Sequence, residues 1–204
     1  MGQETKAKAR IEGGALEGRL HLESDQLLFR GGGMRLEIAV KNIKGASANG
    51  GTLVLAVGRK KYEFDIGTLA QRWADRISNP KTLVQKLGVK SDSTVAYIGA
   101  RDAKLLDELE SAAESVSKKC TRRDYDLIFV GVEKPSDLEL LEGLGASIKS
   151  NGGLWVIFPK GTPDLKAEII IPKVKSRGLV DIKVARVSDR LTGMKFVIPV
   201  HLRK

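Results

Sequence analysis

Lys160 is the polar side chain whose position in this sequence best suits ligand chemistry. It follows an uninterrupted apolar run at residues 154–158, which is preceded by two glycines and closed by Pro159. An apolar run without a polar face is typical of a central strand in a parallel sheet. Ligands of open α/β sheets bind at the carboxyl ends of such strands. Lys160 is therefore a candidate for binding a phosphate or carboxylate, and the alternative is that it only helps to close the loop before Gly161.

The other reactive residue types lack the spacing that catalysis needs. Glu108 and Glu110 are too close along one expected helix to share a site, and Asp124 and Asp126 both lie near the start of a strand, so we interpret both pairs as solvated. Cys120 has basic neighbours but no histidine near it in the sequence, and we expect it to be passive. The two histidines lie far apart with no cysteine near either, which excludes a zinc site of the usual spacing. We predict no catalytic residue and no metal site.

The composition indicates a basic globular chain. Its 204 residues are 42% hydrophobic and carry a net charge of +10. Residues 1–90 hold 16 basic and 9 acidic residues, whereas residues 91–204 hold 19 and 16. The basic excess suits phosphate-rich partners or is a solvated surface. Aromatic residues are 5% and are not interleaved with the basic ones, so no nucleic-acid partner is indicated.

The chain also lacks the signals of export. No apolar stretch approaches the roughly 20 residues that span a bilayer, and the first ten residues are polar. The single cysteine excludes an internal disulfide. We expect a cytoplasmic protein.

The first part of the chain predicts an antiparallel sheet. Apolar and polar residues alternate in several short runs between residues 11 and 66, separated by glycine, asparagine and aspartate, and Asn49-Gly50 is a hairpin signal. A helix with Trp73 on its apolar face follows and ends before Asn79-Pro80. We expect residues 1–9 to be a flexible leader. Residues 10–80 resemble a pleckstrin-homology or GRAM-like domain, a small barrel closed by one helix, through the runs at residues 17–29, 36–57 and 60–66.

The second part, residues 81–204, alternates strands with helices. Apolar strands are expected at residues 94–100, 125–130 and 154–158, and two more at residues 180–187 and 194–200 form a hairpin. Helices are expected at residues 102–111, 136–144 and 165–176. This alternation predicts a three-layer α/β domain with a mostly parallel sheet.

Two resemblances apply to this second part. The runs YDLIFV, SNGGLWVIFPKG, LVDIKVARV and GMKFVIP resemble the Rossmann-like fold of S-adenosylmethionine-dependent methyltransferases. The runs QKLGVK, GGLWVIFPK, RGLVDIKVARV and LTGMKFV resemble the uncharacterised bacterial family called domain of unknown function 3052, over about residues 83–200. The latter implies no assigned activity.

The methyltransferase resemblance implies a cofactor site at the first strand of this part. The family carries a glycine-rich loop there, whereas this chain has Gly99 alone, followed by Ala100. The resemblance also implies an acid for the ribose at the end of the second strand, near residues 115–119, where this chain has Lys118 and Lys119. We therefore expect no cofactor, although S-adenosylmethionine remains possible. The predicted ligand-binding residues are Gly99, Ala100 and Lys160.

The sequence thus predicts a two-domain binding or interaction protein with a degenerate, non-catalytic methyltransferase-like domain. Its partner is an unknown protein or a small anionic ligand. One alternative is an S-adenosylmethionine-dependent methyltransferase with an atypical cofactor loop. The other is a peripheral membrane protein whose barrel associates weakly with acidic lipids.

Overall fold

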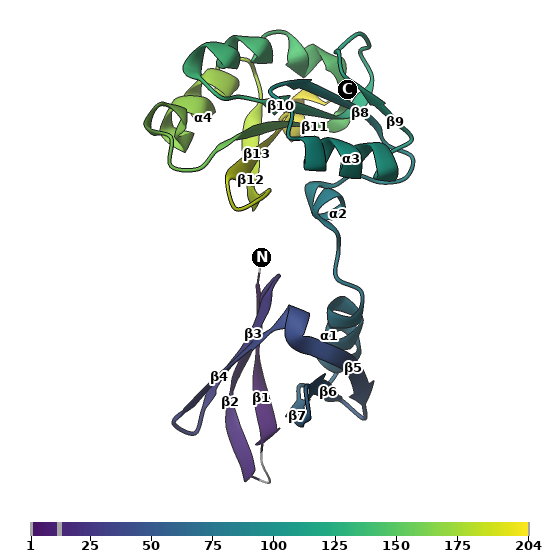
Figure 1. The fold of residues 1–204 in the computed structure, drawn as a ribbon, viewed down its shortest axis with the longest axis vertical. Coiled ribbons are helices and arrows are strands. Elements are labelled where there is room, and N and C mark those ends of the chain that lie inside the picture. Colours follow the sequence, from purple (N-terminus) through teal and green to yellow (C-terminus); the bar gives the residue numbers. More distant parts are fainter. Residues whose placement is uncertain (1, 12–13, 204) are drawn as a thin grey trace. The chain divides into compact units, whose positions relative to one another are not determined.

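The computed structural model describes residues 2–11 and 14–203. The chain divides into two compact units, Met1–Lys81 and Thr82–Lys204 (Figure 1). Each unit has its own buried apolar side chains, between Ala7 and Ile77 in the first and between Val84 and Phe196 in the second. Among the described residues, no helix is long and apolar enough to cross a membrane.

The first unit is built on one antiparallel sheet with the strand order β4-β3-β2-β1-β7-β6-β5. The predicted hairpin at Asn49-Gly50 joins β5 to β6, and both turn residues, Gly50 and Gly51, have a positive φ. The antiparallel sheet is confirmed. Strands β4 and β5 are its two edges and are not hydrogen-bonded to each other in this order, so closure into a pleckstrin-homology-like barrel stays a prediction. The strands are β1 (Gln3–Ile11), β2 (Gly14–Leu22), β3 (Gln26–Gly31), β4 (Met34–Ala39), β5 (Ile43–Asn49), β6 (Thr52–Val57) and β7 (Lys60–Asp65).

The expected flexible leader at residues 1–9 is wrong, because most of it belongs to β1. This strand lies inside the sheet, paired with β2 on one side and β7 on the other. Ala7, Ala9 and Ile11 are buried, while Lys8 and Arg10 between them are exposed. The alternation was missed because alanine is only weakly hydrophobic, so the run reads as a charged tail.

Helix α1 (Leu69–Ser78) follows the sheet and covers its apolar face. Trp73 is fully buried together with Phe29 and Phe64 from the strands. The helix packs mainly against β5 and β6, and the Ser78 hydroxyl donates a hydrogen bond to the Ala46 carbonyl at 3.2 Å. The predicted position of Trp73 on the apolar face of this helix is confirmed.

The second unit is built on a mixed sheet with the strand order β12-β13-β11-β10-β8-β9. Neighbours among β9, β8, β10 and β11 are parallel. Strand β13 is antiparallel to both β11 and β12, so the predicted hairpin forms the end of the sheet with β12 at its edge. The strands are β8 (Thr94–Gly99), β9 (Ser115–Ser117), β10 (Tyr125–Gly131), β11 (Ile148–Pro159), β12 (Val180–Arg186) and β13 (Leu191–Val197).

Helices cover both faces of this sheet, as the predicted three layers require. On one face, α2 (Leu83–Leu87) and α3 (Ala103–Ala112) pack on Tyr97, Phe129 and Trp155. The Trp155 indole donates to the Leu87 carbonyl at 2.9 Å, which attaches α2 to the sheet. On the other face, α4 (Ala167–Lys175) buries Ile170 and Val174.

The helix expected at residues 136–144 is instead two 3₁₀ segments, Pro135–Leu141 and Leu144–Ser147. Leu138, Leu141 and Leu144 are all buried. Their spacing of three residues matches the three residues per turn of a 3₁₀ helix better than an α-helix. Gly143, with φ +72°, separates the two segments.

Candidate functional site

The candidate site lies at the carboxyl ends of β8, β10 and β11. These strands are parallel and buried neighbours, as predicted. The chain runs from β8 to β9 on one side and then to β10 on the other side of β8, so the strand order reverses between β8 and β10. In open α/β sheets, ligands bind in the crevice at such a point.

The loop after β8 lies directly on the end of β10. The Ala100 amide donates to the Gly131 carbonyl at 3.0 Å, and a Cβ at position 131 would lie 1.5 Å from the Ala100 oxygen. Gly99 has φ +75°, and a Cβ there would lie 2.3 Å from the Gly131 oxygen. Both glycines are thus required by the contact between the two strand ends.

Asp102 connects this loop to α3. Its carboxylate caps the helix by accepting from the Leu105 amide at 2.8 Å, and its own amide donates to the Tyr97 hydroxyl at 3.0 Å. Burial raises the pKa of Tyr97. The phenol therefore stays protonated near neutral pH and serves as a neutral hydrogen-bonding group.

A cavity of about 680 Å³ opens at these strand ends. Of the three predicted ligand residues, Ala100 and Lys160 line it, whereas Gly99 does not. Lys160 is not the only charged side chain of this cavity, because acids and bases line it in equal number. The charged lining residues are Arg101, Lys160 and Arg190, and Asp102, Glu133 and Asp189.

Lys160 is engaged with the protein itself. Its ammonium donates to the Ser188 carbonyl at 2.7 Å and to the Asp189 carbonyl at 3.3 Å, in the turn between β12 and β13. An ammonium has three donors, so one remains for solvent or a ligand. The Ser188 hydroxyl accepts from the Arg190 and Leu191 amides and so also serves the turn.

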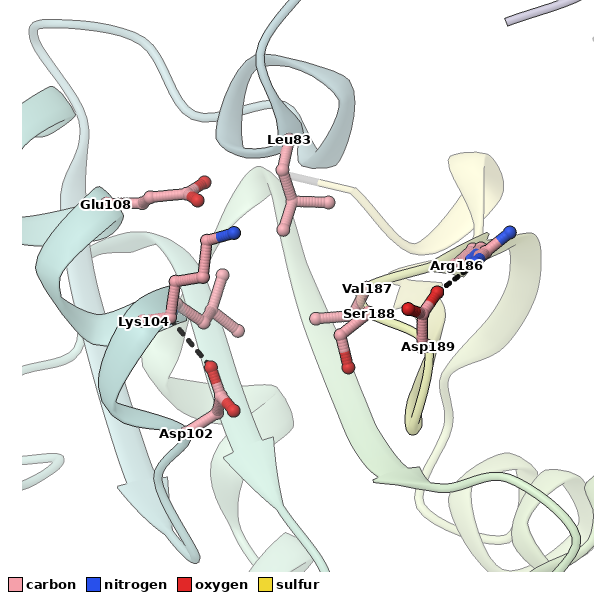
Figure 2. A pocket seen from close by; sticks show the side chains of 9 residues that line it. Leu83, Asp102, Lys104, Glu108, Arg186, Val187, Ser188 and Asp189 are labelled. Carbon is pink, nitrogen blue, oxygen red and sulfur yellow. Dashed lines mark hydrogen bonds and ion pairs between the residues drawn. The ribbon is translucent and has the colours of Figure 1, made fainter. Parts of the chain in front are cut away.

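A second cavity, of about 370 Å³, shares Asp102, Ser188 and Asp189 with the first. Figure 2 shows Lys104 and Glu108 on α3, across from Val187, Ser188 and Asp189 on the β12–β13 turn. Leu83 of α2 lies at one end. Arg186 is ion-paired with Asp189, and the hydrogen bond from Arg186 lowers the pKa of that carboxylate. The two cavities therefore form one polar surface with apolar patches.

Sequence reasoning missed most of these charged residues. Arg101, Glu133 and Arg190 make no ion pair or side-chain hydrogen bond within residues 2–11 and 14–203, and they are available to a ligand. The available signal was position, because each of the three follows a strand end or lies in the β12–β13 turn. Of the charged residues at that edge, only Lys160 was predicted from the sequence as a ligand-binding residue.

The remaining candidates lie elsewhere. Lys118 pairs with Glu110 at 3.5 Å, and the Lys119 carbonyl accepts from the Ser117 and Tyr125 hydroxyls. Cys120 packs at the margin of the apolar core. Within the part of the chain that the structure describes, no group of three His, Cys, Asp or Glu side chains could hold a metal ion.

Comparison with family models and with curated proteins gives no match. The resemblance to domain of unknown function 3052 therefore stays a prediction. Solved structures similar to this chain include S-adenosylmethionine-dependent methyltransferases.

Three of these solved structures show how distant the likeness is. Ribosomal protein L11 methylase from Lactobacillus delbrueckii subsp. bulgaricus is 15% identical with a TM-score of 0.45, over 57% of this chain and 74% of that chain. A methyltransferase from Aquifex aeolicus is 14% identical with a TM-score of 0.41, over 61% and 93%. The C-terminal domain of an unknown protein from Leishmania infantum is 12% identical with a TM-score of 0.32, over 37% and 79%. Structural similarity this distant gives no information about the activity of this chain.

Proposed function

We propose that the second unit is a non-catalytic, methyltransferase-like domain that binds a small polar ligand at the carboxyl edge of its sheet. The observation that carries this proposal is the pair of adjoining cavities, which share Asp102, Ser188 and Asp189. Their lining offers both signs of charge, so the ligand has both anionic and cationic or hydrogen-donating groups. We expect such a ligand to be held by several polar contacts with the charged side chains that line the cavities.

The non-catalytic part of the proposal follows from how the polar side chains are used. Lys160 holds two carbonyls, Ser188 accepts from two amides, Asp102 caps α3 and Asp189 pairs with Arg186. A general acid or base needs a reactive group free to meet the substrate. These four side chains are instead held in structural hydrogen bonds or an ion pair, which leaves Glu133 as the one acid of the larger cavity without a side-chain partner among the described residues.

An S-adenosylmethionine-dependent methyltransferase is the second candidate. It is favoured by the reversal of strand order between β8 and β10 and by a cavity at that place. Against it stand Ala100 in the loop and Lys118 and Lys119 at the end of β9, where the resemblance implies a ribose acid. The proposal for the first unit is a pleckstrin-homology-like interaction module, and weak association with acidic lipids and a cytoplasmic location stay predictions.

Titration calorimetry with S-adenosylmethionine separates the two candidates. We expect no saturable heat at about 0.1 mM cofactor, because two lysines cannot accept hydrogen bonds from ribose hydroxyls and repel a sulfonium cation. Micromolar affinity would contradict the non-catalytic proposal and favour the methyltransferase.

The binding site itself is tested by removing Arg101 and Arg190, the two arginines that line the larger cavity. Small molecules that co-purify with the protein are identified by mass spectrometry, and their binding is compared in an Arg101→Ala/Arg190→Ala variant. We expect this variant to lose the ligand with little change in melting temperature, because neither side chain makes an ion pair or hydrogen bond among the described residues. Arg122→Ala/Arg123→Ala, which removes two exposed arginines outside the cavities, is the control. Equal ligand loss in both variants would contradict the site.

A further inference from the structure

Four basic side chains form a line across the exposed face of the first unit's sheet. Lys6 on β1 is directly opposite Arg19 on β2, Arg19 is opposite Arg30 on β3, and Arg30 is opposite Arg35 on β4. Directly opposite residues share a face of a sheet, and all four are exposed. We call Lys6, Arg19, Arg30 and Arg35 the basic row.

The basic row is unfavourable for the isolated sheet. Neighbouring strands lie about 4.8 Å apart, so four cations lie within about 14 Å. Like charges directly opposite each other destabilise a sheet. A partner that brings negative charge to the row removes this repulsion, and the row therefore has a physical reason to bind an anion.

Only part of the charge is neutralised within the unit. Arg19 pairs with Glu4 at 2.8 Å, and Arg35 pairs with Glu37. Lys6 and Arg30 have no ion pair or side-chain hydrogen bond in the described part of the chain. Exposed ion pairs contribute about 0–1 kcal/mol each, so a ligand carboxylate can displace the two glutamates at little cost.

The surroundings of the row indicate the shape of the partner. Glu4 and Glu37 lie on the same face two residues along β1 and β4, and Glu17, opposite Lys8, lies two residues from Arg19 on its other side. A flat anionic membrane would meet these acids together with the row. A linear anionic chain lying across the strands would meet the cations alone.

The side chains on the exposed face of β1 to β4 favour an acidic polypeptide over a single-stranded nucleic acid as the linear partner. Single-stranded nucleic acid is normally bound by basic residues together with aromatic side chains on which bases stack. On the outward positions of β1 to β4, the described residues include no Phe, Tyr or Trp. Carboxylates need only the cations, and arginine can bind them through two parallel hydrogen bonds.

We propose that the basic row binds an extended, acidic polypeptide segment. Alternate side chains of an extended peptide lie about 7 Å apart, so three successive carboxylates on one side span the length of the row. The segment crosses β1 to β4 with its acidic side chains on Lys6, Arg19, Arg30 and Arg35. This proposal concerns the first unit and does not depend on the ligand proposed for the second.

Fluorescence anisotropy with a labelled glutamate homopeptide tests the proposal on the full-length protein. The variant Lys6→Glu/Arg30→Glu reverses the two unpaired cations and places opposite charges against Arg19 and Arg35, which favours folding. Lys44→Glu/Arg72→Glu is the control, because it makes the same change in net charge on β5 and α1. At low salt, we expect the row variant to bind about tenfold more weakly and the control to stay within about twofold of the wild type.

Three results would overturn the proposal. Equal weakening in both variants would show that net charge alone attracts the peptide. Row-dependent binding of a single-stranded oligonucleotide, or of vesicles rich in phosphatidylserine, that is tighter than peptide binding would assign the row to another partner. Absence of measurable peptide binding by the wild type at low salt would also contradict it. Circular dichroism checks folding, and Lys6→Gln/Arg30→Gln replaces the reversal if that variant is unfolded.

Discussion

At the scale of single residues, Asp126 is an acid whose hydrogen bonds hold strands of the second unit's sheet together. Asp126 was interpreted as part of a solvated face, and the structure shows that it joins three strands. Its carboxylate accepts from the Thr94 amide at 2.9 Å and from the Lys149 ammonium at 2.9 Å. Thr94 begins β8 and Lys149 lies near the start of β11, so Asp126 fixes the amino ends of the parallel strands.

Asp126 should make stability depend on pH. Burial alone would raise its pKa, but the hydrogen bonds from Lys149 and Thr94 outweigh it and lower the pKa. Since the folded pKa is depressed, its stabilisation is present above the unfolded value of about 4 and is lost as pH falls through the folded pKa. We expect Asp126→Asn to lower the free energy of unfolding by about 1–2 kcal/mol at pH 7, and by less in acid.

Urea unfolding at several pH values measures this effect. Asp124→Asn is the matched control, because among the described residues Asp124 pairs only with the exposed Arg122, at 3.0 Å. A loss in Asp126→Asn that is the same at pH 7 and in acid would show that the charge of Asp126 is not what stabilises the sheet.

The candidate site shows the limit of prediction at this scale. The place was predictable, because Lys160 follows a strand that the sequence marks as central. The partners of Lys160 were not, because Ser188 and Asp189 are 28 and 29 residues away in the chain and contribute carbonyls rather than side chains. Every residue has a backbone carbonyl, so the residue types in a sequence do not show which carbonyl will accept a hydrogen bond.

At the scale of elements, β1 is the main difference between prediction and structure. Its inward side chains are the small Ala7 and Ala9, so its apolar pattern is weak, but it lies between β2 and β7. Elements with large apolar side chains were predicted better. Strands β8, β10 and β11 coincide with runs of aliphatic and aromatic residues, and α3 begins after its cap, Asp102, within the expected range 102–111.

The position of β1 gives a direct test. Ala9 is fully buried, whereas its neighbour Lys8 is exposed. We expect Ala9→Asp to destabilise the first unit by several kcal/mol, because it buries an unpaired charge, and Lys8→Gln to change stability by about 0.5 kcal/mol or less, because Gln adds no charge opposite Glu17 and Asp65. Thermal unfolding followed by circular dichroism measures both. Similar, small effects of the two changes would show that these residues are a leader rather than a strand.

At the scale of the whole molecule, the switch in sequence pattern near Pro80 is matched by two separate sets of buried side chains. The core of the first unit, with Phe29, Phe64 and Trp73, contains no residue beyond Ile77. The cores on the two faces of the second sheet begin at Val84. The change from alternating runs to strands and helices was visible in the sequence because the two kinds of sheet bury different faces: one side in the first unit, both sides in the second.

Because the cores share no side chain, we expect each unit to fold without the other. Fragments of residues 1–81 and 82–204, produced separately, should each unfold cooperatively and keep the secondary structure that they have in the full chain. Heating each fragment and the full chain, followed by circular dichroism, measures this. Trp73 and Trp155 are fully buried, one in each unit, and the fluorescence of each fragment reports on its own core. A fragment whose tryptophan emits as in water, with no cooperative transition, would show that its core needs the other unit to form.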